Sequence, residues 1–130
     1  MPRIALLFAS LHALLMLLLA ARVVFHRRSH KIGIGDGGDK YLLRKMRAHG
    51  NFVEYVPMAL LMLALLELGG LDARWLWTFG ATLLLARGLH AFGLSKRSGV
   101  SFGRFWGTLL TWLALAGMAG AGVFIVAASA

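Results

Sequence analysis

The sequence predicts an all-α membrane protein, a four-transmembrane-helix bundle, and two observations carry this prediction. Hydrophobic residues make up 59% of the 130 residues, whereas roughly half of a soluble domain is apolar. The mean hydropathy is +0.75. Four apolar stretches are also present, each close to the length of about 20 residues that crosses a bilayer as a helix. We therefore expect one helical membrane domain covering residues 1–130.

The four expected spans are residues 4–25, 50–69, 75–94 and 105–128. The first follows Arg3 and exceeds the apolar region of a signal peptide, which covers about 7–15 residues. No clear small-residue cleavage site follows it, so we interpret it as a mature helix. Before the second span, Asp39 is expected to be the N-cap of an amphipathic helix that continues into that span.

The fourth span places small residues four positions apart, which allows membrane helices to approach closely. These residues are Ala116 with Gly120 and Gly117 with Ala121. The alternative is that this stretch only faces lipid.

The net charge of +9 is unevenly distributed along the chain. Basic residues gather after the first span and again after the third: Arg27, Arg28, Lys31, Lys40, Arg44, Lys45 and Arg47, then Lys96, Arg97 and Arg104. This alternation predicts two cytoplasmic loops, with the N- and C-termini outside. Membrane topology thus accounts for most of the basic excess, and we expect no nucleic acid partner. Because the chain has no cysteine, disulfides and thiolate metal sites are excluded, and we expect no metal.

A polar stripe opens the second span. Arg47, Asn51, Glu54 and Met58 fall within about 60 degrees on one helix face. Glu54 lies roughly 10 Å deeper than Arg47, where an ionised carboxylate needs a partner. On the third span, Arg87 is the candidate partner, and we predict an ion pair between Glu54 and Arg87.

His90 lies one turn beyond Arg87, and Arg104 opens the last span at the same membrane face. Each of these polar residues also has a simpler role that needs no ligand. Arg47 would anchor its helix at the membrane surface, His90 would be a neutral core group, and Arg104 would cap the last loop. The ion pair of Glu54 with Arg87 would be a structural bridge. Their gathering at one end nevertheless predicts a polar pocket. Guanidiniums bind carboxylates in a bidentate manner, so such a pocket suits a small zwitterion with net negative charge, such as glutathione. Arg104 or His90 would then stabilise its thiolate.

Three segments also resemble the MAPEG family of membrane-associated proteins in eicosanoid and glutathione metabolism. They are "RAHGNFVEYVP", "GDGG" before it, and "ARGLHAFGL". The resemblance covers essentially the whole chain, is strongest to bacterial members, and implies a homotrimer in the inner membrane with glutathione as co-substrate, bound between subunits. Carried over by residue, it implies glutathione contacts from Arg47, Asn51, Glu54, Tyr55, Arg87 and His90, with Arg104 as the catalytic residue that stabilises the thiolate and a weaker match for Arg22.

One departure bears on the activity. Eicosanoid-forming relatives carry a tyrosine one turn beyond the position of His90, and Leu94 stands there in this chain. The resemblance therefore implies a glutathione transferase or peroxidase acting on hydrophobic electrophiles or lipid hydroperoxides. The alternative is a non-catalytic structural or ligand-sensing protein whose polar stripe locks the helices. A second open alternative is that the pocket holds another anionic thiol in place of glutathione.

Overall fold

Four long helices make up the computed structural model, which describes the backbone of residues 1–96 and 101–129 and the side chains of residues 1–94 and 101–128. The helices are α1 (Arg3–Ser29), α2 (Lys40–Leu68), α3 (Ala73–Lys96) and α4 (Phe102–Ser129). Each coincides with one expected span, except that α2 ends at Leu68, one residue before the expected end. The all-helical prediction is therefore confirmed for the described residues. Arg97, which we had placed in a cytoplasmic loop, lies outside them.

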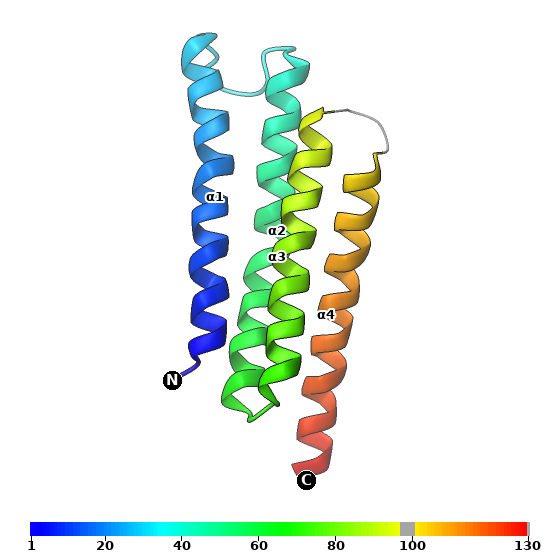
Figure 1. Cartoon of the computed structure of the whole chain (residues 1–130). Coiled ribbons are helices and arrows are strands. Elements are labelled where there is room, and N and C mark those ends of the chain that lie inside the picture. The colour runs from blue at the N-terminus through cyan, green and yellow to red at the C-terminus, as the bar shows by residue number, and fades with distance from the viewer. Residues whose placement is uncertain (97–100, 130) are drawn as a thin grey trace.

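The helices run alongside one another, with α2 and α3 between α1 and α4 (Figure 1). Both termini lie at the same end as the short α2–α3 connection, and the α1–α2 loop lies at the opposite end. Within the described residues, α4 packs against α3 and α2 but makes no contact with α1. One flank of α1 and one flank of α4 are therefore left without a partner in the single chain.

The largest core cluster lies in the half of the bundle nearer the termini. Ala59 and Leu63 of α2 and Leu83 of α3 are completely buried in it. Phe8 of α1 packs directly over Gly80 of α3, where any side chain would collide with the phenyl ring. This apolar packing holds α1 against α3.

Two carboxylates cap the helices. Asp39 accepts hydrogen bonds from the backbone N–H groups of Tyr41 and Leu42, at 2.7 and 3.2 Å, so the predicted N-cap of α2 is confirmed. Glu67, near the end of α2, accepts from the N–H groups of Ile4 and Ala5 at 2.9 and 2.7 Å. Each carboxylate satisfies donors that a helix N-terminus leaves without partners.

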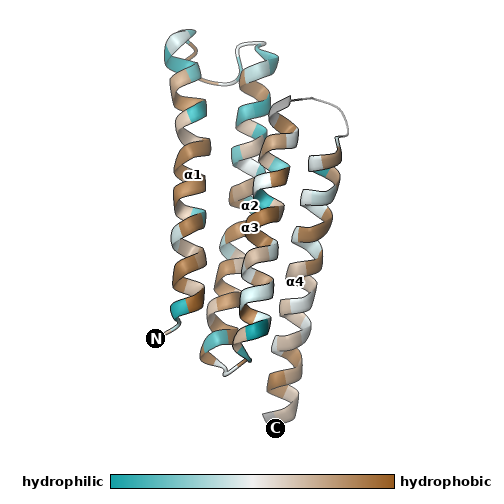
Figure 2. Cartoon of the chain, viewed as in Figure 1, coloured by the Kyte–Doolittle hydropathy of each residue, from teal (hydrophilic) through white to brown (hydrophobic). Residues whose placement is uncertain are grey.

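Three of the described helices are long and apolar enough to cross a membrane: α1, α2 and α4. α3 is not among them, and Arg87 and His90 interrupt its apolar sequence. Hydrophilic residues concentrate toward the α1–α2 loop end of α1, α2 and α3, whereas the end of α4 near the C-terminus is apolar (Figure 2). Charged residues also occur at the opposite end, at the start of α1 and around the α2–α3 connection (Figure 2). The larger group of polar residues nevertheless lies toward the α1–α2 loop, which we call the polar end.

Candidate functional site

Arg87 forms the centre of the polar end. Its side chain is buried, with 1% exposure. Nη2 donates a hydrogen bond of 2.6 Å to Asn51 Oδ1 on α2, and Nη1 donates one of 3.3 Å to Thr111 Oγ1 on α4. The guanidinium also lies over the ring of Tyr55, 6.0 Å from its centroid. One side chain therefore joins α2, α3 and α4 through neutral partners.

The predicted ion pair between Glu54 and Arg87 is wrong. Glu54 forms no ion pair within the described structure, and it lies on the exposed flank of α2. Asn51 instead faces α3 and takes up the guanidinium. The two positions are three residues apart, about 60 degrees around the helix, and this rotation is enough to put one side chain inside the bundle and the other outside.

Asn51, His90 and Arg104 line two adjoining cavities. The smaller, of ≈ 180 Å³, is completed by Leu43, Arg44, Arg47 and Leu94. The larger, of ≈ 410 Å³, is completed by residues of α4: Phe105, Thr108, Leu109 and Trp112. The first cavity is bounded by arginines and the second mainly by apolar side chains, so an anionic group and an apolar group can occupy neighbouring positions.

His90 lines both cavities and carries an unsatisfied ring nitrogen. The side chain is buried, with 5% exposure, and within the described structure its Nδ1 atom has no hydrogen-bond partner. A buried polar atom without a partner costs free energy. Other atoms of His90 line both cavities, so the ring lies next to any ligand bound there.

Arg104 reaches the site because α4 begins beside it. Ser101 precedes α4, and its Oγ accepts a hydrogen bond of 3.4 Å from the backbone N–H of Arg104. The next turn contains "GRFWG", with Gly103 and Gly107 four residues apart. A Cβ atom added at Gly107 would come within 2.7 Å of the His90 backbone N, and one added at Gly93 would come within 2.7 Å of the Arg104 N. These glycines let α3 and α4 touch and place Arg104 next to His90.

The small-residue prediction for α4 pointed to a different segment. Gly117 does pack against the Phe79 ring, since a Cβ atom added there would lie 2.8 Å from the ring. A Cβ atom added at Gly120 would meet no atom within 4 Å. Gly103 and Gly107, which we had not singled out, make the closest approach to α3. Their spacing is the membrane-helix pattern of two glycines separated by three residues, so the signal was present in the sequence.

The remaining predicted residues lie at the edge of the site or away from it. Arg47 lines the smaller cavity, whereas Glu54, Tyr55 and Arg22 are not among the lining residues of either cavity. Arg87 lies behind Asn51 and supports it. The structure thus brings together Arg47, Asn51, His90 and Arg104 within one chain.

Comparison with known proteins agrees with the resemblance found in the sequence. The model of the MAPEG family matches residues 5–124. The chain belongs to the MAPEG family. The inner membrane protein YecN of Escherichia coli strain K12 is 34% identical over 115 residues, which is 84% of this chain and 82% of YecN. YecN of Escherichia coli O6:H1 gives the same values. This MAPEG member is therefore an integral membrane protein, in agreement with its apolar helices.

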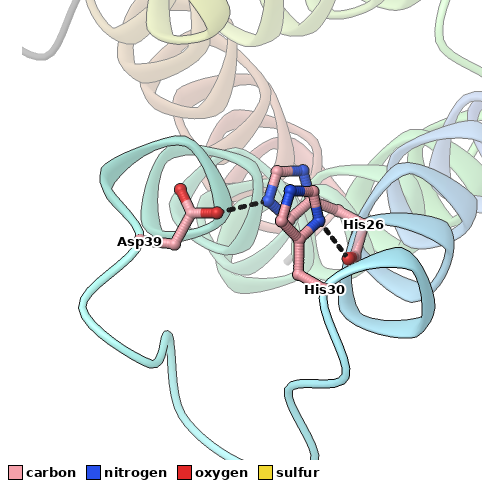
Figure 3. A group of neighbouring side chains, drawn as sticks. All are labelled: His26, His30 and Asp39. Carbon is pink, nitrogen blue, oxygen red and sulfur yellow. Dashed lines mark hydrogen bonds and ion pairs between the residues drawn. The ribbon is translucent and has the colours of Figure 1, made fainter.

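A second group of titratable side chains lies at the α1–α2 loop of this MAPEG chain (Figure 3). His26 Nε2 lies 2.6 Å from Asp39 Oδ2, and the His30 ring stacks on the His26 ring at 4.2 Å. The hydrogen bond from His26 lowers the pKa of Asp39 to about 2. Potential ligand atoms of His26, His30 and Asp39 lie within 4.8 Å of one another. However, Lys45 Nζ is 2.8 Å from His26 Nδ1, and this ammonium disfavours a cation there.

Proposed function

We propose that this protein binds glutathione and acts as a membrane glutathione transferase or peroxidase. The observation that carries the proposal is the paired cavity, in which an arginine-lined part adjoins an apolar part. Arg47 and Arg104 supply charge for the carboxylates of glutathione, and Asn51 supplies an amide. Membership of the MAPEG family, which includes glutathione transferases, supports the same conclusion.

Arg104 is the residue we assign to thiol activation. A guanidinium beside the sulfur favours the thiolate and so lowers the pKa of the glutathione thiol below its reference value near 8.5. In conjugation, the thiol proton leaves to solvent, the thiolate electron pair forms a carbon–sulfur bond, and the leaving group departs with its own pair. In the peroxidase reaction, two glutathione molecules are oxidised to the disulfide while the hydroperoxide is reduced to an alcohol and water.

The apolar cavity is the proposed place for the second substrate. Phe105, Leu109 and Trp112 face it, and Phe105 and Trp112 are also exposed on the surface of the chain, so a hydrophobic electrophile can enter from the bilayer. Leu94 lines the smaller cavity and has no hydroxyl group. Among the described residues that line the two cavities, Thr108 alone carries a hydroxyl group. These features favour general conjugation or peroxide reduction over the synthesis of a specific eicosanoid.

We further propose a homotrimer with glutathione between subunits. Glu54 is exposed on α2, beside the exposed apolar side chains of Val53 and Met58. In lipid such a carboxylate is costly, and a neighbouring subunit or its bound ligand would cover it. In this arrangement Glu54, Tyr55 and Arg22 approach glutathione at the subunit interface.

Placement in the inner membrane, with the basic loops cytoplasmic and both termini outside, is also a proposal. The name of YecN supports the inner membrane, and the basic loops support the orientation. Because the chain has no cysteine, Ser29→Cys and Ala73→Cys report the two sides separately. An impermeant thiol reagent applied to whole cells should label Ala73→Cys alone, and labelling of Ser29→Cys alone would reverse the orientation.

The test is glutathione binding to the purified protein by calorimetry, with the thiolate followed by its ultraviolet absorbance. We expect binding with thiolate formation, and conjugation of a model electrophile. Arg104→Ala should lower conjugation by about two orders of magnitude or more. Arg74→Ala is the matched control, because Arg74 is exposed at the opposite end of the bundle, beside Asp72. Equal activity of both variants would remove Arg104 from the mechanism, and absence of binding at millimolar glutathione would overturn the proposal.

A non-catalytic role is the second candidate, and the Arg87 network favours it. A buried guanidinium that joins three helices has a structural role without any ligand. In this case the protein would bind glutathione or another anionic thiol without turnover, or bind neither. Binding without thiolate formation or conjugation would select this candidate.

A further inference from the structure

A second cavity lies away from the paired site, at the loop end of α1. Its volume is ≈ 380 Å³, and it is lined by Val24, Arg27, Arg28, Lys31, Ile32 and Gly33. Three cations and two aliphatic side chains therefore surround one groove. We call it the α1 basic groove.

Among the described residues, no carboxylate lines the α1 basic groove. The acids of the adjacent loop are already engaged. Asp39 accepts from His26 and from the first turn of α2 (Figure 3). Asp36 accepts from the backbone N–H of Gly38 at 3.0 Å. Arg28 and Lys31 are exposed, and their side chains make no hydrogen bond or ion pair among the described residues. The positive charge of the groove is thus not neutralised by the chain itself.

The backbone at the end of α1 is built around Lys31. The N–H of Ile32 donates to the carbonyl of Arg27 at 3.0 Å, and the N–H of Lys31 donates to that of Arg28 at 3.4 Å. This pair of bonds is the Schellman motif, whose left-handed position is usually glycine. Lys31 occupies it with φ of 54°, the one non-glycine residue with positive φ in the described structure. A strained cation therefore stands where glycine would be more stable, and strain of this kind often accompanies function.

The same motif also removes an obstacle to anion binding. The last carbonyl groups of a helix carry partial negative charge that repels anions. Here the carbonyls of Arg27 and Arg28 are hydrogen-bonded within the motif. Arg27 is held in place by bonds to the carbonyl of Gly33 and to Met46 Sδ, at 3.3 and 3.4 Å, and it forms the fixed wall of the groove.

The groove also has the right depth in a bilayer. α1 has 27 residues, about 40 Å of helix, against a hydrocarbon core of about 30 Å. Its final turn, with the basic groove, therefore lies at headgroup level, while Val24 one turn earlier lies at the edge of the hydrocarbon. A phospholipid with its phosphate near Arg28 and Lys31 would therefore place its acyl chains beside Val24.

From these observations we propose that the α1 basic groove binds the phosphodiester headgroup of an anionic phospholipid. Arg28 and Lys31 contact the phosphate oxygens, Arg27 completes the charge, and Val24 and Ile32 contact the glycerol and the first methylene groups. Basic residues near a membrane surface attract anionic lipid in this way. The site is independent of glutathione binding, because it shares no lining residue with the paired cavities.

The experiment measures thermal unfolding and native mass spectra of the full chain in phosphatidylcholine nanodiscs, with and without phosphatidylglycerol. Phosphatidylglycerol should raise the unfolding temperature and be retained as a bound lipid. In the double variant R28Q/K31G, affinity for this lipid should fall on the order of tenfold or more. Lys40→Gln is the matched control, since Lys40 is an exposed cation of the same loop region that does not line the groove, and it should retain the lipid.

Lys31→Gly alone gives a result that a purely structural role cannot give. It should raise stability in phosphatidylcholine, because glycine relieves the positive φ, and at the same time reduce the response to phosphatidylglycerol. Equal lipid retention in R28Q/K31G and Lys40→Gln would overturn the proposal. An equal rise in unfolding temperature with inorganic phosphate in place of the lipid would also overturn it, because the groove would then be a site for free anions.

Discussion

Gly107→Ala tests whether the contact between α3 and α4 builds the candidate site. An added Cβ would lie 2.7 Å from the Ala86 carbonyl oxygen and 2.7 Å from both the N and Cβ atoms of His90. Carbon atoms in contact normally stay about 3.5–4.0 Å apart. Because the atoms that would be met include backbone atoms of α3, no side-chain rotation relieves the clash, and the two helices must separate locally by about 1 Å.

The expected cost follows from two opposing terms. Overpacking a tight contact costs about 1–3 kcal/mol. Replacing glycine by alanine inside a helix returns about 0.5–1 kcal/mol. We therefore expect Gly107→Ala to lower the free energy of unfolding by about 1–2 kcal/mol. The same shift moves His90 away from Arg104, so glutathione affinity should fall as well.

The assay is denaturant unfolding in one detergent, together with glutathione binding, for the parent and two variants. Gly88→Ala is the matched control. Gly88 is also a glycine of α3 near the site, but a Cβ atom added there would meet no atom within 4 Å. Gly88→Ala should equal or exceed the parent in stability. If Gly107→Ala proved as stable as Gly88→Ala and bound glutathione equally well, the close approach of α3 and α4 would not support the site.

Three further predictions concern the polar contacts. Asn51→Ala removes the nearer of the two acceptors of the buried Arg87 guanidinium and should destabilise the protein by about 2–3 kcal/mol in denaturant unfolding. A change below half of that would mean that another acceptor replaces Asn51. Glu67→Ala removes the cap of α1 and should cost about 1 kcal/mol, with faster hydrogen exchange confined to the start of α1; exchange unchanged there would contradict the cap. The pKa of Asp39 is lowered by the His26 hydrogen bond from 3.8 to about 2, so the stability contributed by this carboxylate is full above pH 4 and is lost as the pH falls toward 2. An acid titration of unfolding should show this loss in the parent and not in Asp39→Ala.

The helices and one cap were predictable from the sequence because their causes are local. Apolar runs of about 20 residues form helices in a bilayer, where every backbone group must be bonded within the chain. Asp39 was recognisable as an N-cap because its side chain reaches N–H groups two and three residues later. Such signals need no knowledge of the neighbouring helices.

The partner of Arg87 was not predictable in the same way. Charge alone favoured Glu54, but which of two residues on one helix faces α3 depends on the rotation of that helix about its axis. The packing of Phe52, Val56 and Ala59 against other helices sets this rotation, and it places Asn51 inward. The role of Glu67 was missed for a similar reason, since it caps a helix 62 and 63 residues earlier in the chain.

The use of Asn51 in place of Glu54 has a consequence for binding. An ion pair with a carboxylate would cancel the charge of Arg87, whereas an amide and a hydroxyl accept hydrogen bonds from Nη2 and Nη1 and leave the charge in place. The buried Nε of Arg87 has no hydrogen-bond partner in the described structure. Arg104 and Arg47 add to the positive potential of the cavities in front of it, and in a region of low dielectric this potential is screened weakly. A site built in this way favours an anion over a neutral ligand. Glu54, not used for Arg87, is then available on the outer flank of α2 for the ammonium group of a zwitterion or for a neighbouring subunit.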